Sequence, residues 1–301
     1  MKKVLYSIGI IALVAAAVPA AVRFIGSAGL EPYDYRQDVI NTEYTDISRR
    51  FLDLEGSFNT RDIGGYPTRD GAVTAWNSIY RSDHLNLLTD RDLDKISSLG
   101  IQTVIDLREP GRRDAYPNRL PEGVVSRNLP IYDDTKPLHL PVLIRRSSIS
   151  SHFLASYVEY LEEWGERFVP IFEVLADPDA YPVLYHCSNG KDRAGVLTAL
   201  LLDLAGVNRE LIISDFSLSN HPIDDVIEKF IEHEEGTMLM RVGVPRDELA
   251  ELMGVRSQWI ISLLEHIDST YGSTRQYLSH IGVAEEILTA VTENITESYD
   301  M

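Results

Sequence analysis

One short polar loop joins an apolar, strand-forming run to a helix-forming run. Residues 181–185 read Tyr-Pro-Val-Leu-Tyr, and residues 196–204 are mostly apolar and helix-forming. The loop between them contains Cys187, the only cysteine among 301 residues, and Arg193 follows six positions later. A strand that turns tightly into a helix is typical of α/β folds. Because a helix N-terminus leaves backbone N–H groups unpaired and favours anions, this loop is suited to hold an oxyanion against a thiolate.

The loop resembles the Cys-x5-Arg signature of protein tyrosine and dual-specificity phosphatases. Its Lys191-Asp192-Arg193 run is similar to the bacterial tyrosine phosphatases that also act on phosphoserine, phosphothreonine and phosphoinositides. The plain alternative is a core cysteine at a strand end, but that does not account for the polar loop or the arginine. The resemblance implies a three-layer tyrosine-phosphatase-like α/β fold. In that fold, helices flank a central, mostly parallel sheet.

Three further segments resemble elements of the same family, in the same order. They are residues 59–66, which read Asn-Thr-Arg-Asp-Ile-Gly-Gly-Tyr, residues 80–82 (Tyr-Arg-Ser) and residues 106–108 (Asp-Leu-Arg). For Arg61 and Asp62, two interpretations stay open. They form a structural ion pair beside a turn, or they contact the substrate directly.

The resemblance assigns a role to each residue of the loop. Cys187, as a thiolate, would attack phosphorus and form a cysteinyl-phosphate, while Arg193 would hold the phosphate oxygens. His186 would orient the sulfur or stabilise its charge. Lys191 would add a positive charge suited to a substrate with a second phosphate. The expected phosphate-binding residues are Ser188, Asn189, Gly190, Lys191, Ala194 and Gly195.

A general acid must protonate the leaving oxygen, and three aspartates are candidates. Asp192 occupies the position that the resemblance implies for the acid. Asp133 follows a predicted strand, where other tyrosine phosphatases keep a mobile acid. Asp106 ends a strand that we expect beside the catalytic one, and its expected role is supporting. We therefore expect Asp192 to be the acid.

Ala194 departs from the family pattern, which usually has threonine or serine at this position. In the family, that hydroxyl helps the sulfur to leave in the second half-reaction. We therefore expect the phosphoenzyme to be hydrolysed slowly relative to its formation.

The chain divides into a leader, a linker and one domain. We expect the leader over residues 1–30, the linker over 31–55 and the phosphatase domain over 56–297. One long amphipathic helix is predicted over residues 150–175, since its apolar residues have helical spacing. Residues 222–254 are predicted to form two helices, which are either a lid over the site or a simple helical hairpin.

The leader has the pattern of a secretory signal. Lys2 and Lys3 precede residues 4–22, which carry no charge, and small residues follow. The alternative is an uncleaved membrane anchor, because 19 uncharged residues are just long enough to span a bilayer. We therefore expect a protein that is exported, to the periplasm or beyond the cell, or one that is attached to the membrane through residues 4–22.

Composition limits the partners. The formal net charge is −18, which argues against nucleic acid as a partner. The expected partner is a phosphorylated protein, or a phosphoinositide or inositol phosphate. A single cysteine allows no intrachain disulfide. The eight histidines are scattered without metal-ligand spacing, so neither a metal nor a cofactor is expected.

Two other classes of protein share part of the pattern. A rhodanese-type sulfurtransferase also uses a cysteine in an anion-binding loop, but it does not need the segment at residues 59–66. A phospho-ligand binding module without catalysis would keep Arg193, but it usually loses the cysteine or the acid, and both are present here.

Overall fold

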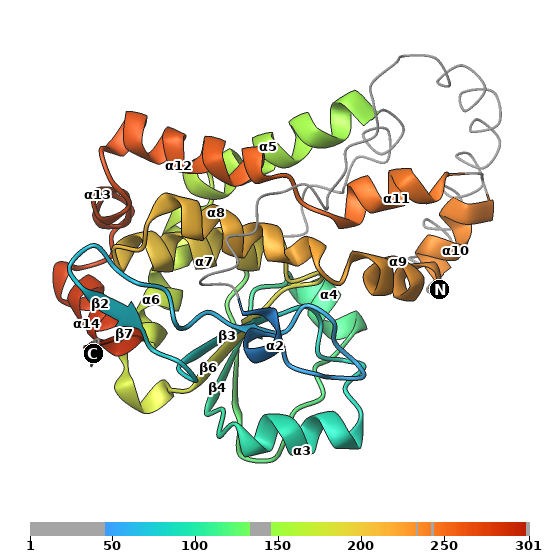
Figure 1. Ribbon diagram of the computed structural model, residues 1–301, viewed down its shortest axis with the longest axis horizontal. Helices are drawn as coiled ribbons and strands as arrows, with labels where there is room; N and C mark the ends of the chain where they lie inside the picture. The colour runs from blue at the N-terminus through green and yellow to red at the C-terminus, as the bar shows by residue number, and fades with distance from the viewer. Residues whose placement is uncertain (1–45, 133–145, 233, 242–243, 299–301) are drawn as a thin grey trace.

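A five-stranded sheet lies at the centre of the molecule (Figure 1). The computed structural model describes residues 46–132, 146–232, 234–241 and 244–298. In sheet order, the strands are β1 (Arg61–Asp62), β3 (Ile79–Ser82), β6 (Val183–His186), β4 (Thr103–Asp106) and β5 (Val125–Asn128). Only β1 runs antiparallel to its neighbour, β3, within this sheet. The expected mostly parallel sheet is therefore confirmed.

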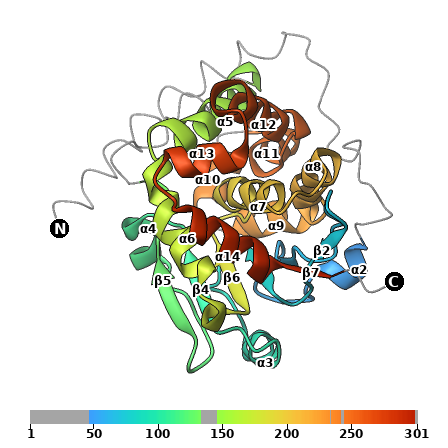
Figure 2. The same ribbon diagram turned by 90° about the vertical axis from the view of Figure 1, so that its left-hand side faces the viewer.

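Helices cover both faces of the sheet, and the strands alternate between two hydrophobic cores. Val183 and Tyr185 of β6 belong to the larger core, whereas Leu184 between them belongs to the smaller one. This alternation follows from the two-residue period of a strand. The smaller core includes Ile96 of α3 (Asp90–Ser98), which lies on the opposite side of the sheet from α7 (Arg193–Leu204) (Figure 2). The three-layer α/β architecture is thus the observed one.

The helix that follows Cys187 is the centre of the larger core. All residues of α7 are buried, which explains why its sequence has no polar face. Three later helices contact α7, namely α8 (Arg209–Ser217), α13 (Thr274–His280) and α14 (Glu285–Ile295). The helix α12 (Ser257–Tyr271) packs against α8. A two-stranded sheet of β2 (Ala72–Thr74) and β7 (Thr296–Ser298) joins the two ends of the domain.

The long helix predicted over residues 150–175 is interrupted. The structure contains α5 (Arg146–Glu162), a 3₁₀ turn (Gly165–Phe168) and α6 (Val169–Ala176) instead. Gly165 fits close to Ile281 and Tyr277, because a Cβ atom at this position would lie 2.9 Å from each of them. Pro170 then occupies the first turn of α6, where its missing N–H is tolerated. The helical periodicity was right, but Gly165 and Pro170 divide the segment.

The predicted linker extends too far toward the domain. Residues 31–45 lie outside the described residues, but residues 46–55 belong to the packed structure. They contain α2 (Ile47–Arg50), and Arg50 is fully buried. Its Nη1 atom donates to the carbonyl oxygens of Asp62 and Gly64, at 2.8 and 2.7 Å. The domain therefore begins at or before residue 46.

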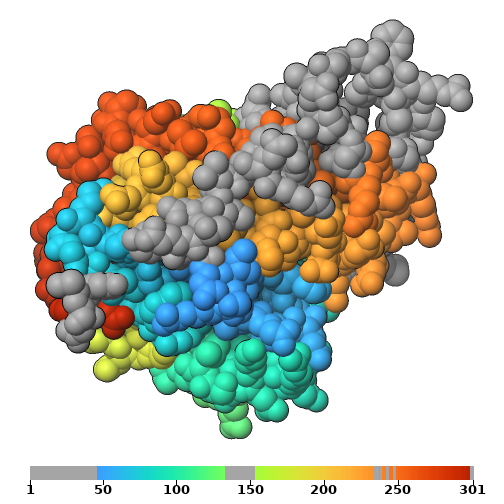
Figure 3. All heavy atoms as spheres, viewed as in Figure 1, coloured from blue at the N-terminus to red at the C-terminus, as the bar shows by residue number. Residues whose placement is uncertain are grey.

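Three helices, rather than two, occupy residues 222–254. They are α9 (Ile223–Glu232), α10 (Glu234–Arg241) and α11 (Arg246–Met253), and they gather at one end of the molecule (Figure 3). Ile223, Ile227, Leu249 and Met253 form a small core of their own. A separate core is what a lid needs in order to move as a unit, but movement of these helices stays a prediction.

None of the described helices is long and apolar enough to cross a membrane.

Candidate active site

Cys187 lies at the carboxyl end of the central strand, where α/β folds place their ligands. Cys187 is only 1% exposed, and β6 ends at the residue before it. Asp192 is the N-cap of α7, and Arg193 is the first residue of that helix. Residues 187–193, called the Cys187 loop below, therefore make the whole turn from strand to helix. The structure brings the three predicted catalytic residues, Cys187, Asp192 and Arg193, into this one loop.

The amides of the Cys187 loop are available to an anion. Within the described part of the chain, the N–H groups of residues 188–193 have no protein acceptor. Gly190 has a φ of 66°, a left-handed conformation that glycine adopts without strain. Ala194 and Gly195 are buried in the first turn of α7. Unpaired amides at a helix N-terminus form a binding site for phosphate-like ions.

Arg193 is held at the edge of the loop by two side-chain acceptors and, at 3.4 Å, by the carbonyl oxygen of Leu107. Its Nη2 atom donates to Ser188 Oγ at 3.2 Å, and its Nη1 atom donates to Glu109 Oε2 at 2.6 Å. Burial alone would lower the pKa of Arg193, but the nearby Cys187 sulfur and other anionic groups raise it above its usual value. The guanidinium is therefore fixed in its charged form beside the sulfur.

Lys191, which was expected to offer a positive charge to a second phosphate, is buried. Its side chain is 2% exposed, and its Nζ atom donates to Asp192 Oδ1 at 2.9 Å. The same ammonium lies 3.9 Å from the ring centroid of Phe153 and 5.6 Å from that of Trp259. Tyr157 also donates to Asp192 Oδ1, at 2.7 Å. The Lys191 ammonium is thus buried between Asp192 and two aromatic rings.

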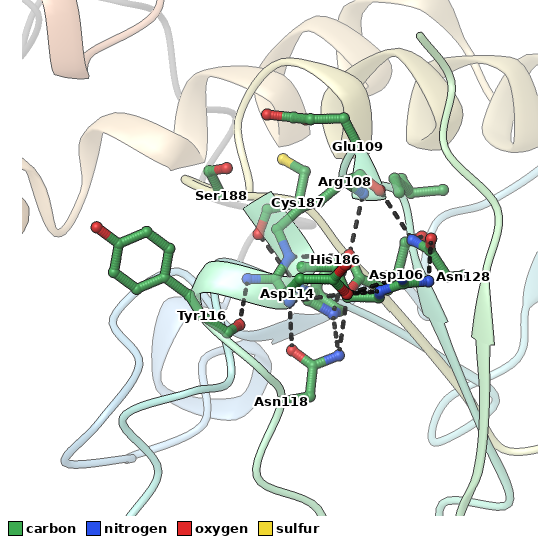
Figure 4. A network of polar contacts seen from close by, with 12 residues as sticks. Asp106, Arg108, Glu109, Asp114, Tyr116, Asn118, Asn128, His186, Cys187 and Ser188 are labelled. Carbon is green, nitrogen blue, oxygen red and sulfur yellow. Dashed lines mark hydrogen bonds and ion pairs between the residues drawn. The ribbon is translucent and has the colours of Figure 1, made fainter. Parts of the chain in front are cut away.

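His186 belongs to a polar network beneath the sulfur, together with Asp106 (Figure 4). Its Nδ1 atom is 3.2 Å from the Cys187 carbonyl oxygen, and its Nε2 atom is 2.9 Å from Asn118 Nδ2. These contacts fit a neutral ring that donates from Nδ1 and accepts at Nε2. Arg108 holds Asp106 through both carboxylate oxygens, at 2.9 and 2.8 Å. This geometry supports an orienting and supporting role for both predicted residues.

The alternative role of His186, stabilising the sulfur by charge, does not fit its burial. Desolvation lowers the pKa of His186 to about 4, despite the opposing effect of Asp106. The ring is therefore neutral near neutral pH.

Stability should fall on mild acidification because of His186. Its pKa in the folded protein is below the unfolded value, so the unfolded state binds more protons between the two values. The contribution is complete above about pH 6.5 and is lost as pH falls toward 4. We expect the free energy of unfolding in urea to drop by about 2 kcal/mol between pH 7 and pH 5 from this group. A His186→Asn variant should lack this part of the slope, and equal slopes in the two proteins would contradict the assignment.

The contacts of Arg61 decide between the two interpretations of Arg61 and Asp62. Its side chain is fully buried and makes an ion pair with Asp215 of α8, at 3.4 Å, rather than with Asp62. Asp62 instead accepts from the backbone N–H groups of Gly64 and Asn77, at 2.7 Å each. The motif is therefore structural, and neither residue is positioned to contact a substrate.

Four residues near the loop were missed as site residues. Glu109 contacts Arg193, and Tyr157 contacts Asp192. Arg81 donates directly to the carbonyl oxygen of Gly190 in the loop, and Asp215 anchors Arg81 from the other side. Asp215 had a signal in the sequence. It lies at helical spacing from the buried Leu211 and Ile212, so a carboxylate falls on the core face of α8. For Glu109, the signal is its place directly after the Asp-Leu-Arg segment.

Aromatic side chains flank the loop on one side. The Arg193 guanidinium lies 5.0 Å from the ring centroid of Tyr132, and Tyr132 stacks on Tyr160 at 5.8 Å. Asp133, the second candidate for the acid, follows Tyr132 but lies outside the described residues. Within those residues, no group of three or more His, Cys, Asp or Glu side chains could hold a metal ion.

Comparison with known proteins gives consistent matches. The model of the tyrosine phosphatase family matches residues 52–297. The triple specificity protein phosphatase PtpB of Mycobacterium tuberculosis is 28% identical over 269 residues, covering 77% of this chain and 94% of that protein. A tyrosine-protein phosphatase of Nostoc commune is 27% identical over 212 residues, covering 70% and 71%. The crystal structure of P. aeruginosa TpbA in complex with pTyr matches 61% of this chain and 90% of its own, at 15% identity and a TM-score of 0.26.

Proposed function

This chain belongs to the tyrosine phosphatase family and is a phosphatase, and from that premise we propose that it hydrolyses phosphomonoesters through a cysteinyl-phosphate on Cys187. One observation carries the proposal. The Cys187 sulfur lies in a loop whose amides have no acceptor among the described residues, beside an arginine that Glu109 and Ser188 hold in place. The family match also favours this reading over a sulfurtransferase.

The first half-reaction transfers the phosphoryl group to sulfur. The Cys187 thiolate attacks phosphorus, an S–P bond forms, and the P–O bond to the leaving group breaks. The loop amides and the Arg193 guanidinium hold the equatorial oxygens while charge spreads over them. Asp192 gives its proton to the leaving oxygen, so that an alcohol or phenol departs.

The second half-reaction returns the enzyme to its starting state. Water attacks phosphorus, the S–P bond breaks, and the thiolate is restored. The Asp192 carboxylate accepts the proton from that water, and inorganic phosphate leaves. The sum is the hydrolysis of one monoester by one water molecule, with neither a metal nor a cofactor among the reactants.

Asp133 lies outside the described residues, and of the other two candidate acids we propose Asp192. It lies in the loop, where Tyr157 and Lys191 fix its Oδ1 atom. Asp106 is a weaker candidate, because Arg108 holds both of its oxygens. Although burial alone would raise the pKa of Asp106, Arg108 and His186 lower it, which favours the deprotonated form.

Phosphorylated proteins are the substrates that the geometry favours. PtpB is named a triple specificity protein phosphatase, and a phosphorylated side chain of a protein carries a single phosphate. The buried position of Lys191 weakens the case for phosphoinositides with several phosphates, because its charge is directed at Asp192.

We also propose that the enzyme acts outside the cytoplasm, exported or attached to a membrane through residues 4–22, since those residues have the pattern of a signal or anchor.

A substrate panel tests the proposed function. The full-length chain should hydrolyse an aryl phosphate and phosphotyrosine peptides, with inhibition by orthovanadate. It should be slower on phosphoinositides. Hydrolysis that resists vanadate, or sulfur transfer from thiosulfate at a comparable rate, would overturn the proposal.

Ala194 should make dephosphorylation the slow step. It is fully buried in the first turn of α7, where the family usually has a hydroxyl that helps sulfur to leave. Stopped-flow measurements with p-nitrophenyl phosphate should show a burst of nitrophenolate of about one equivalent per enzyme. Ala194→Ser, the smaller of the two family residues in this buried site, should raise steady-state turnover about 10-fold and shrink the burst. The absence of a burst, with unchanged turnover in Ala194→Ser and Ala194→Thr, would contradict this.

A further inference from the structure

Four successive carbonyl groups of the Cys187 loop are held by one segment, residues 59–84. His84 N donates to the carbonyl of Ser188 at 3.2 Å, and Asn59 Nδ2 donates to that of Asn189 at 3.0 Å. Arg81 Nη2 donates to the carbonyl of Gly190 at 2.7 Å and reaches that of Lys191 at 3.5 Å. This segment contains two of the family segments, at residues 59–66 and 80–82, for which the chemistry above has no role.

We propose that Asn59 and Arg81 are positioning residues that turn the loop carbonyls outward, so that the loop amides converge on the phosphate. A peptide group is planar, and its N–H and C=O point in opposite directions. Drawing consecutive carbonyls to one side therefore turns the intervening amides to the other. Converging amides of this kind form an anion-binding concavity. The inference rests on the proposed function, because it gives that phosphate site its shape.

Arg81 is built to make these contacts. It is fully buried on β3, and its Nη1 atom pairs with Asp215 Oδ1 at 2.8 Å, which aims Nη2 at the loop. Gly195 leaves room for it, since a Cβ atom there would lie 3.3 Å from Arg81 Nη2 and 2.8 Å from the Phe216 ring. Gly190 packs against the end of β3 just as closely, where a Cβ atom would lie 2.7 Å from Asp83 N.

Asn59 is oriented by its other amide atom. Its Oδ1 atom accepts a hydrogen bond from Arg61 Nη1, which leaves Nδ2 to face the carbonyl of Asn189. Arg61 is in turn anchored on the backbone and side chain of Asp215. The Asp215 carboxylate therefore fixes Arg81 directly, and it fixes Asn59 through Arg61. Two guanidinium groups share one carboxylate beneath the loop, which favours an anion above it.

The test compares two buried arginines that each hold two backbone carbonyls. Arg81→Lys keeps the charge but loses the fork that joins Asp215 to the loop. Arg50→Lys is the matched control, because Arg50 holds carbonyls of Asp62 and Gly64, outside the loop. In the full-length chain, tungstate binding by calorimetry should weaken about 10-fold to 100-fold in Arg81→Lys. KM for p-nitrophenyl phosphate should rise in parallel. Arg50→Lys should change both by less than about 3-fold, even where its melting temperature falls equally.

A second variant covers the case in which Arg81→Lys does not fold. Asn59→Ala removes one donor and should weaken tungstate binding about 5-fold or more. Tungstate affinity within about 2-fold of wild type in Asn59→Ala, or within about 3-fold in a folded Arg81→Lys, would overturn the proposal. Equal losses in Arg50→Lys would also overturn it, since the effect would then be general destabilisation. Failure of the proposed function is distinct, because wild type itself would then neither bind tungstate nor hydrolyse the aryl phosphate.

Discussion

Replacing Cys187 with serine should lower kcat for p-nitrophenyl phosphate by at least about 1,000-fold and leave the anion site intact. A serine hydroxyl is a weak nucleophile unless a base removes its proton. The ring of His186, the residue before Cys187, points its Nδ1 atom at the Cys187 carbonyl instead. The loop amides and Arg193 do not depend on the sulfur, so tungstate should still bind. Steady-state kinetics and calorimetry measure the two effects separately.

Mass spectrometry of the wild-type enzyme and the Cys187→Ser variant can detect the cysteinyl-phosphate directly. Acid-quenched wild-type enzyme, mixed with substrate, should carry a phosphoryl group on the peptide that contains Cys187, as found by mass spectrometry. Cys187→Ser should bind substrate without this adduct. If the serine variant keeps more than about one tenth of the wild-type kcat, Cys187 is not the nucleophile.

Local features of the site could be predicted from the sequence because they follow one another along the chain. The β6 strand, the Cys187 loop and α7 are contiguous, so chemistry and periodicity were enough to place Cys187 beside Arg193. The N-cap of α3 is equally local, since Thr89 forms a capping box with Asp92, three positions later. Each of these depends on residues a few positions apart, and local rules apply there.

Features that depend on distant parts of the chain could not be predicted. Lys191 is buried because α5 and α12 bring Phe153 and Trp259 over it, and their stacking distance of 4.7 Å is set by the packing of two helices. The strand that ends at Asp106, β4, lies beside β6 as expected, but the contact of Glu109 with Arg193 depends on how the segment after β4 turns toward the loop. No spacing in the sequence reports these contacts. A buried lysine beside a loop acid therefore reads, from sequence alone, as a charge that faces solvent.

The arrangement also explains how an acidic protein can take an anionic substrate. The chain carries a net charge of −18, which repels phosphate at long range. Screening by salt confines that repulsion to about 8 Å at physiological ionic strength. Arg61, Arg81 and Arg193 are all buried around the loop, where screening is weak. The positive potential therefore acts at the sulfur and does not extend over the surface.

Replacing Asp192 with asparagine should reduce activity in proportion to how poor the leaving group is. Loss of a general acid typically lowers the rate 100-fold to 10,000-fold when the leaving oxygen needs a proton. We expect a loss of about that size with a phosphoserine peptide. With p-nitrophenyl phosphate, whose leaving group is stable as an anion, the loss should be about 10-fold or less. Asparagine keeps an oxygen that can accept from Tyr157 and Lys191, so the loop should stay in place.

Two matched variants decide which aspartate is the acid. Asp106→Asn removes a buried partner of Arg108, and it should lower stability and slow both substrates equally. Asp133→Asn should have little effect on either substrate. If Asp192→Asn instead slows both substrates equally while Asp133→Asn spares the aryl phosphate and not the peptide, the acid is Asp133. Leaving-group dependence is the discriminating measurement because only the group that donates the proton makes the rate depend on the basicity of the departing oxygen.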